Sequence, residues 1–182
     1  MTISLKPFEA GDIDRLLSWI DSEALMVQWS GPYFTWPLTR PALEAYQRTA
    51  FQEPAIRKIH KVVDDSSGDV VGHIELNNLD FRNLSATLSR VLIAPQARGR
   101  GICLPMTRAI LAVAFDQLYL HRVNLNVYDF NHKAIRCYER AGFRREGFQR
   151  HVARVGSEFW DSWSMAILED EWRALTARQE QA

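Results

Sequence analysis

The stretch that decides the fold of this chain is Val91 to Ile102, which reads V-L-I-A-P-Q-A-R-G-R-G-I. An apolar run predicts a strand up to Pro95, and the glycine-rich turn that follows opens a helix. A helix start leaves backbone N–H groups without partners and carries the positive end of the helix dipole. Arg98 and Arg100 add positive charge. The stretch therefore predicts a site for an anion such as a pyrophosphate, because glycines let a ligand approach the backbone closely.

The commonest nucleotide-binding turns do not fit this stretch. A P-loop ends in Gly-Lys-Ser/Thr, whereas Gly101 is followed by Ile102 and Cys103. The dinucleotide fingerprint requires a third glycine where Leu104 stands. Gln96 to Gly101 instead satisfies the pattern Arg/Gln-x-x-Gly-x-Gly/Ala. Taken alone, so short a turn is also compatible with an ordinary tight connection between a strand and a helix.

A second segment makes the match specific. Asn126 to Phe143 reads N-V-Y-D-F-N-H-K-A-I-R-C-Y-E-R-A-G-F, a strand that leads to an asparagine and then to a short helix ending in Gly-Phe. The two segments resemble the two signatures of the Gcn5-related N-acetyltransferase (GNAT) superfamily, and the distance between them fits one helix and one strand. The matching residues of the second segment are Asn131, Ala134, Tyr138, Gly142 and Phe143.

The resemblance covers most of the chain. Within the superfamily, the chain resembles the group that contains the ribosomal-protein N-terminal alanine acetyltransferases. This finer resemblance is supported by the aromatic stretch Trp29 to Leu38 and by the region Trp160 to Trp172.

Periodicity and turn residues predict the order of the elements along the chain. We expect strands at Ile3–Phe8, Ile56–Val63, Val70–Leu76, Ala86–Ile93, Val123–Val127, Val152–Val155 and Glu158–Leu168; helices at Asp12–Ser22, Thr39–Phe51, Ile102–Gln117 and Lys133–Arg140; an ordered loop at Met26–Leu38; and turns at Asp64–Asp69 and Asn77–Asn83. Pro105 predicts a distorted first turn in the third helix. This order predicts an α/β (α+β) fold of GNAT type, with a mixed, mostly antiparallel central sheet flanked by helices in a single domain of residues 1–182.

The composition is that of an ordinary globular protein. Of its 182 residues, 47% are hydrophobic and 24% are charged, and the formal net charge is zero. No global charge favours a nucleic acid or an anionic membrane as partner. We find no secretion signal in Met1 to Phe8 and no apolar stretch long enough to span a bilayer. We therefore expect a cytoplasmic protein.

The chain has two cysteines, Cys103 and Cys137, far apart in the sequence. No C-x-x-C and no H-x-x-x-H spacing occurs, so neither a disulfide framework nor a metal site is predicted. We expect two small buried thiols in a reducing compartment.

The resemblance implies an activity: transfer of an acetyl group from acetyl-coenzyme A to a primary amine by direct attack. The acceptor is expected to be a protein N-terminus or a small-molecule amine, and a homodimer is expected by analogy. Two other interpretations of the function remain open. One is a module that binds acyl-coenzyme A as a sensor without turnover. The other is a ribosome- or RNA-associated protein that uses the arginine run Arg136, Arg140, Arg144, Arg145 and Arg150, which also fits a solvated face.

The resemblance also implies roles for individual residues. Val91, Leu92 and Ile93 belong to a strand that would pair with the pantetheine arm, with a backbone N–H near the thioester oxygen. Asn131 would hydrogen-bond that arm, and Tyr138 would contact the cofactor and protonate the leaving thiolate. The phosphates would be held by Gln96, Arg98, Gly99, Arg100, Gly101 and Ile102. Tyr138 also fits a plain core aromatic.

The general base and the acceptor pocket have several candidates. Glu75, acting through a water, leads for the base. His73, on the same face of the strand, and Ser89 are substitutes, and a water chain to solvent would also serve. The aromatic residues Trp29, Tyr33 and Trp36 are expected to bind the acceptor, although core packing or a dimer contact would also use them.

Overall fold

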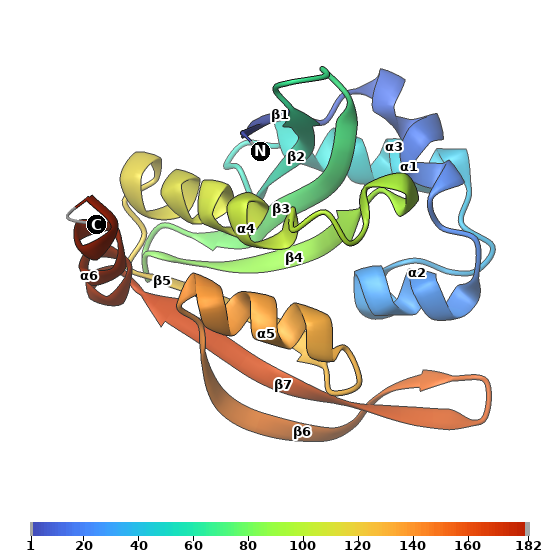
Figure 1. Cartoon of the computed structure of the whole chain (residues 1–182). Coiled ribbons are helices and arrows are strands. Elements are labelled where there is room, and N and C mark those ends of the chain that lie inside the picture. The colour runs from blue at the N-terminus through green and yellow to red at the C-terminus, as the bar shows by residue number, and fades with distance from the viewer. Residues whose placement is uncertain (1, 181–182) are drawn as a thin grey trace.

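Seven strands form one sheet in the order β1-β2-β3-β4-β5-β7-β6 (Figure 1). The structure is a computed structural model that describes residues 2–180, so residues 1, 181 and 182 of the predicted domain lie outside it. The strands are β1 Ile3–Pro7, β2 Arg57–Asp64, β3 Val70–Asp80, β4 Ser85–Ile93, β5 Arg122–Tyr128, β6 Arg144–Val155 and β7 Glu158–Leu168. Neighbouring strands are antiparallel except β4 and β5, which are parallel. The predicted mixed, mostly antiparallel sheet is confirmed.

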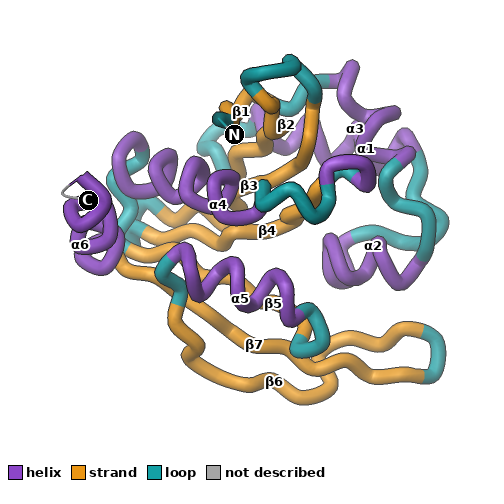
Figure 2. The backbone as a smooth tube through the Cα atoms, viewed as in Figure 1, coloured by secondary structure: helices purple, strands orange, loops and turns teal. Residues whose placement is uncertain are grey.

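Helices lie on both faces of this sheet (Figures 1 and 2). They are α1 Ile13–Ser18, α2 Glu23–Ser30, α3 Arg40–Arg48, α4 Cys103–Ala112, α5 His132–Ala141 and α6 Glu169–Glu180. Short 3-10 turns cover Ala10–Asp12, Gly31–Tyr33, Thr49–Phe51 and Pro95–Ala97, and a π-helical turn, Val113–Gln117, continues α4. No helix among residues 2–180 is both long and apolar enough to cross a membrane.

Alternation along β3 shows which helices cover which face. Gly72 lies against α4, because a Cβ added there would be 3.2 Å from the sulfur of Met106. The next residue, His73, points to the opposite face and meets Tyr46 of α3. One face of the sheet therefore carries α4, and the other face carries α3. The cluster around Glu75 described below lies on the α3 face, whereas the glycine-rich turn leads into α4.

The stretch Met26 to Leu38 is not the loop that the sequence predicts. Its first part belongs to α2, which begins after Ser22, and the Ser22 hydroxyl accepts the N–H of Leu25 at 3.3 Å. Gly31, with φ of +59°, ends this helix. The turn residues therefore mark the end of a helix and not an extended loop.

Three further expectations change in detail. Pro105 does not distort α4, because it is the third residue of the helix, where the backbone N–H has no intrahelical partner in any case. The predicted turn at Asn77–Asn83 is shorter, since β3 continues to Asp80 and the turn occupies residues 81–84. The helix α6 and residues 144–151 of β6 were not predicted.

Candidate active site

Strands β4 and β5 separate after a short region of pairing. Only Ser85 to Thr87 pair with β5, opposite Arg122 to Asn124. The remainder of β4 therefore leaves backbone groups on its β5 side without a strand partner. Val91, Leu92 and Ile93, the residues predicted for the pantetheine arm, lie in this separated part. Free N–H and C=O groups in an extended strand can pair with an extended ligand, as in β-augmentation.

A β-bulge at Arg90 lies in the separated part of β4. Leu92 is opposite His73 and Ser89 is opposite Glu75, so two residues of β4 face the single residue Ile74. Arg90 has φ of +49°, in the left-handed region that non-glycine residues rarely occupy. Regular alternation would place the Arg90 side chain on the face opposite to Glu75. The bulge instead brings it to Glu75.

The backbone of Arg90 is held by two side chains. Its carbonyl oxygen accepts hydrogen bonds from the indole N–H of Trp29 at 3.0 Å and from Nδ1 of His73 at 2.8 Å. Since a carbonyl only accepts, His73 carries its proton on Nδ1. Burial lowers the pKa of His73 to about 4, so the ring is neutral near pH 7. His73 thus fixes the bulge, and its other ring nitrogen, Nε2, lies 3.3 Å from the Tyr46 hydroxyl.

Glu75 lies at the centre of a buried cluster. Its carboxylate pairs with the Arg90 guanidinium and accepts a hydrogen bond from the Tyr46 hydroxyl at 2.6 Å. Arg57 lies farther away, with Nη1 3.8 Å from Oε2 of Glu75. The Glu75 side chain has no solvent exposure. This geometry favours a role in holding Arg90 over that of a base, because a base must reach the amine or a water beside it. The base role of Glu75 stays a prediction.

The glycine-rich turn has the backbone that an anion site requires. Gly99 and Gly101 have φ of +79° and +78°, conformations that an L side chain adopts only with strain. Arg98 and Arg100 are exposed beside them, and Arg100 pairs with Asp64 at 3.0 Å. Gln96 is exposed as well, whereas Ile102 is buried, so only its backbone is available to a ligand.

A cavity of about 290 Å³ adjoins this turn and is strongly basic. It is lined by Gly101, Cys103, Leu104, Lys133, Arg136, Cys137 and Arg140. The cationic side chains come from α5, which lies beside the start of α4 (Figure 1). Two of the arginines in the predicted basic run therefore lie next to the anion turn. This location suits the phosphate groups of a nucleotide.

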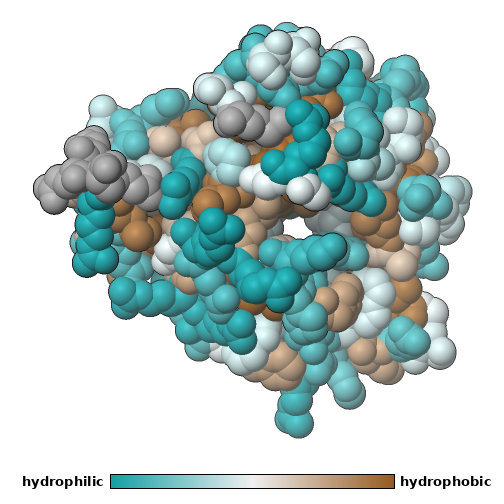
Figure 3. Space-filling model, in the orientation of Figure 1, coloured by the Kyte–Doolittle hydropathy of each residue, from teal (hydrophilic) through white to brown (hydrophobic). Residues whose placement is uncertain are grey.

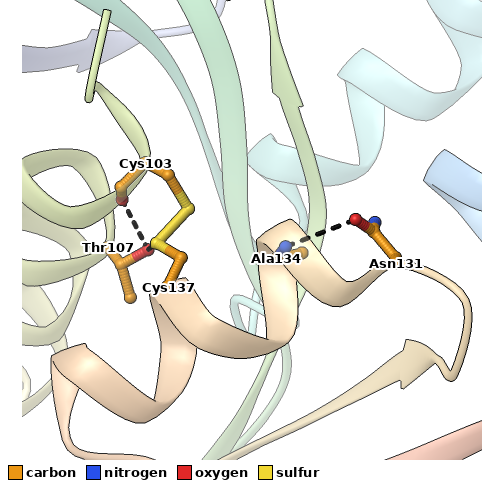
Figure 4. The surroundings of a disulfide bond; sticks show 5 residues. All are labelled: Cys103, Thr107, Asn131, Ala134 and Cys137. Atoms are coloured by element: carbon orange, nitrogen blue, oxygen red, sulfur yellow. Dashed lines mark hydrogen bonds between the residues drawn. A yellow bond between two sulfur atoms is a disulfide. The ribbon is translucent and has the colours of Figure 1, made fainter. Parts of the chain in front are cut away.

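The two cysteines form a disulfide, contrary to the prediction of two thiols. The bond joins Cys103 at the start of α4 to Cys137 on α5, and Thr107 lies beside it with Oγ1 3.9 Å from the Cys137 sulfur (Figure 4). Packing of α4 against α5 brings the two Cα atoms to 6.3 Å, within the range of disulfides. A separation of 34 residues in sequence conceals this proximity.

Asn131 and Tyr138 both lie on or at α5. The side-chain oxygen of Asn131 accepts the N–H of Ala134 at 3.3 Å and caps the helix, which leaves its amide NH₂ for a ligand (Figure 4). Tyr138 is buried and packs edge-on against Phe143, with ring centroids 5.8 Å apart. Burial raises the pKa of Tyr138. Its hydroxyl has no hydrogen bond to any described residue, so it is free to donate to a bound group.

A second cavity, of about 280 Å³, opens where β4 and β5 separate. Its walls come from α2 and the following turn, from β4 and β5, and from the β6–β7 hairpin, and Figure 3 shows the molecule hollowed near its centre in this region. The lining residues are Gln28, Trp29, Ser30, Gly31, Pro32, Thr87, Leu88, Ser89, Arg90, Asn126, Val127, Tyr128, Gln149, Val152 and Ser162. Among these described residues, Arg90 is the only charged one.

The predicted aromatic residues divide into three environments. Trp29 lines this cavity, stacks on Phe34 with centroids 5.4 Å apart and is buried. Tyr33 is 44% exposed and lies over the Arg90 guanidinium, 4.1 Å from the ring centroid. Trp36 is exposed and is not part of the lining. The structure thus brings Trp29, Ser89 and Arg90 together, while Tyr138 and Glu75 lie outside the lining.

Sequence reasoning missed Arg57, Arg90 and Tyr46. These residues come from β2, β4 and α3, and only the folded chain brings them to Glu75. One signal was present in the sequence. Arg90 interrupts the apolar alternation Ala86, Leu88, Leu92, and a charge on an otherwise apolar face requires a buried partner.

An anion turn at the start of a helix, a parallel strand pair that opens beside it and a polar cavity at the opening define an acyltransferase that binds a nucleotide-linked acyl carrier. Residues 2–144 match the family of the acetyltransferase (GNAT) domain, and the chain belongs to this family. The protein is an acetyl-coenzyme A-dependent N-acetyltransferase.

Relatives of known structure and sequence extend over almost the whole chain. The spermidine N(1)-acetyltransferase of Vibrio cholerae is 26% identical over 171 residues, which is 93% of this chain and 95% of that protein. The crystal structure of the spermidine N-acetyltransferase of Vibrio cholerae, in complex with CoA and spermine, has a TM-score of 0.83 at 24% identity and covers 93% of this chain and 97% of that chain. This structural similarity shows the fold.

The predicted resemblance to the ribosomal-protein group has weaker support. YdaF of Bacillus subtilis, whose name provisionally places it among ribosomal N-acetyltransferases, is 33% identical over 105 residues. The match covers 58% of this chain and 57% of that protein. The GNAT superfamily is confirmed, whereas the ribosomal-protein group stays a prediction.

Proposed function

We propose that this protein acetylates the primary amine of a small molecule that enters the cavity between α2 and the separated strands. The observation that carries the proposal is the opening of β4 and β5 after Thr87, with a cavity of about 280 Å³ at that opening. Such a volume suits a small ligand. The cofactor arm would lie along Val91, Leu92 and Ile93, and the amine would approach from the cavity.

The phosphates of the cofactor would lie at the glycine-rich turn. Gly99 and Gly101 give backbone N–H groups a close approach to an anion, and Arg98 and Arg100 supply charge. Gln96 and the backbone of Ile102 complete the turn. The basic cavity lined by Arg136 and Arg140 adjoins the same turn and would hold a further phosphate.

The reaction is a direct transfer. The neutral amine nitrogen attacks the thioester carbon, a C–N bond forms, and the C–S bond breaks. The nitrogen then loses one proton, and the CoA sulfur gains one. Tyr138 would donate that proton to the sulfur, because its hydroxyl lies on α5 without a hydrogen bond to a described residue. Water in the open cavity would take the proton from nitrogen, beside Ser89.

Three acceptor classes are candidates within this function. A polyamine is favoured by the full-length similarity to the spermidine N(1)-acetyltransferase of Vibrio cholerae. An amine that carries a negative group is favoured by the buried arginines Arg57 and Arg90, which have N–H groups without partners among the described residues. A protein N-terminus has support only from the partial similarity to YdaF.

The test is release of CoA thiol from acetyl-coenzyme A with a panel of amines that includes spermidine. Tyr138→Phe should retain acetyl-coenzyme A binding and lose most of its turnover. Tyr119→Phe, which removes the hydroxyl of a well-exposed tyrosine, is the matched control and should retain full activity. Binding of acetyl-coenzyme A without thiol release for any amine would show a sensor module, and the proposed function would then be withdrawn.

A further inference from the structure

The buried cluster around Glu75 carries more positive than negative charge. Arg57 and Arg90 are only 6% and 7% exposed, and Glu75 is the carboxylate that faces them. Tyr46 stays neutral because burial raises its pKa well above the usual value. His73 is neutral near pH 7, as described above. Two guanidinium groups therefore share one carboxylate, and an uncompensated buried charge is costly unless a counter-charge arrives.

The same arginines have buried donors without acceptors. Nε and Nη1 of Arg57 and Nε of Arg90 have no hydrogen-bond partner among the described residues. The 3.8 Å from Arg57 Nη1 to Glu75 is too long for a hydrogen bond. Buried polar groups without partners are rare in proteins, and each one requires an explanation. The explanation that fits two guanidinium groups is an anionic ligand, because a carboxylate can accept several N–H bonds at once.

The cluster is next to the acceptor cavity. Arg90 lines that cavity, together with Gly31 and Pro32. The ring of Tyr33 follows directly in the chain and lies over both guanidinium groups, 5.2 Å from Arg57 and 4.1 Å from Arg90. Tyr33 is partly exposed, so its ring lies between the two guanidinium groups and solvent. A carboxylate that reached the unpaired donors would have to displace this ring.

The cavity lining disfavours a polycation. None of its described residues is Asp or Glu, and its one charged residue is an arginine. A polyamine would enter without a counter-charge and would face Arg90. An amine with a carboxylate would place its negative group at the arginines and its amine toward the opening between β4 and β5.

We infer that Arg57 and Arg90 determine acceptor specificity and select amines that carry a carboxylate, such as α-amino acids, over polyamines. This inference rests on the proposed function. Arg57 is the specificity residue to test, because Arg90 also shapes the bulge on β4. In this scheme Tyr33 lies over the arginines in the free enzyme.

The experiment compares each of the common α-amino acids with its carboxamide, which keeps the amine and removes the negative charge. Initial rates of thiol release give kcat and KM for the full-length protein with saturating acetyl-coenzyme A, and spermidine is the third substrate. The wild-type protein should favour the acid over the carboxamide by about tenfold to a hundredfold in kcat/KM for its best amino acid. Spermidine should be a poorer substrate than that acid.

Variants distinguish a role of Arg57 in binding the acceptor from a role in stabilising the fold. Arg57→Met should raise KM for the acid by about tenfold or more with kcat retained, and should leave the carboxamide within about twofold. Arg57→Lys should restore part of the preference, because a lysine keeps the charge without the planar fork. Lys58→Met, which removes a positive charge from the opposite face of β2, is the matched control and should preserve the preference.

Three results would overturn the inference. An equal loss for acid and carboxamide in Arg57→Met would show a purely structural role. A wild-type protein that acetylates spermidine or the carboxamides better than every acid would refute the preference for a carboxylate and leave the proposed function intact. This comparison uses the wild-type protein alone, so it tests the inference even if Arg57→Met does not fold. No turnover with any amine would refute the proposed function and the inference together.

Discussion

The hydroxyl of Tyr46 donates a 2.6 Å hydrogen bond to the carboxylate of Glu75, although the two residues are 29 positions apart in the sequence. The bond fastens α3 to the centre of the sheet. It also satisfies one oxygen of a carboxylate that has no contact with solvent, while Arg90 satisfies the other. The first prediction follows from this arrangement.

Glu75→Gln should destabilise the fold more than Tyr46→Phe. The first change leaves two buried guanidinium groups without a counter-charge, which typically costs about 3–5 kcal/mol of unfolding free energy. The second removes a single hydrogen bond to a charged group and should cost about 1–3 kcal/mol. Urea unfolding at pH 7 measures both values. A Glu75→Gln protein as stable as the wild type, and inactive, would instead support the predicted base role of Glu75.

Stability should fall as the pH is lowered from about 6.5 to about 4. The pKa of His73 is about 4 in the folded protein and 6.5 when the ring is exposed in the unfolded chain. Between these two values the unfolded chain therefore binds more protons than the folded protein. The difference is worth roughly 3 kcal/mol for a fully buried ring. His60, whose pKa burial also lowers to about 4, adds to the effect.

Urea unfolding at pH 7 and pH 5 tests this linkage. His73→Gln and His60→Gln should each reduce the pH dependence of the unfolding free energy, and the double variant should remove most of it. Asp12, whose pKa is lowered by hydrogen bonds to Glu9, Lys61 and Arg15 in spite of burial, loses its contribution only at lower pH. An unchanged slope in the double variant would contradict the assignment to these histidines.

Gly101→Ala should weaken the binding of acetyl-coenzyme A. The residue has φ of +78°, and a Cβ there costs about 1–2 kcal/mol of backbone strain and stands where phosphates would approach. Calorimetric titration with acetyl-coenzyme A measures the loss. Gly156→Ala, with φ of +58° in the β6–β7 turn, is the control: it introduces similar strain and should leave affinity unchanged. Equal losses in both variants would argue against phosphate binding at the turn.

Reduction of the Cys103–Cys137 bond should lower stability. A bridge that closes 34 residues contributes about 4 kcal/mol by the chain-entropy relation. Urea unfolding with and without dithiothreitol measures the change, and thiol titration of the untreated protein counts free cysteines. Cys103→Ser with Cys137→Ser should match the reduced protein and no longer respond to dithiothreitol. Two free thiols in the untreated, unfolded protein would contradict the bond.

Local signals predicted the backbone around the glycine-rich turn. Glycines and a preceding strand lie within one short stretch, and the structure contains a turn with left-handed Gly99 and Gly101 between β4 and α4. The end of α5 at Gly142, with φ of +107°, is likewise predicted by a local signal, because a glycine readily adopts the left-handed conformation that ends a helix. The cap that Asn131 forms on α5 was not predicted.

The buried cluster around Glu75 could not be predicted in the same way. It depends on the register of β2, β3 and β4 and on one bulge, none of which has a local sequence pattern. The helix α2 was concealed by the turn residues that end it, and the disulfide by its long sequence separation. Each of these features depends on interactions between segments that are far apart in the sequence.

The short parallel contact between β4 and β5 has a mechanical consequence. Since only Ser85 to Thr87 join the two strands, the sheet consists of one part with β1 to β4 and another with β5, β7 and β6, paired at one end. A ligand arm hydrogen-bonded along the open side of β4 would take the place of the pairing that is missing between the two parts. The bound cofactor would then complete the sheet as well as supply the acetyl group, while the Cys103–Cys137 bond holds α4 to α5 across the same gap.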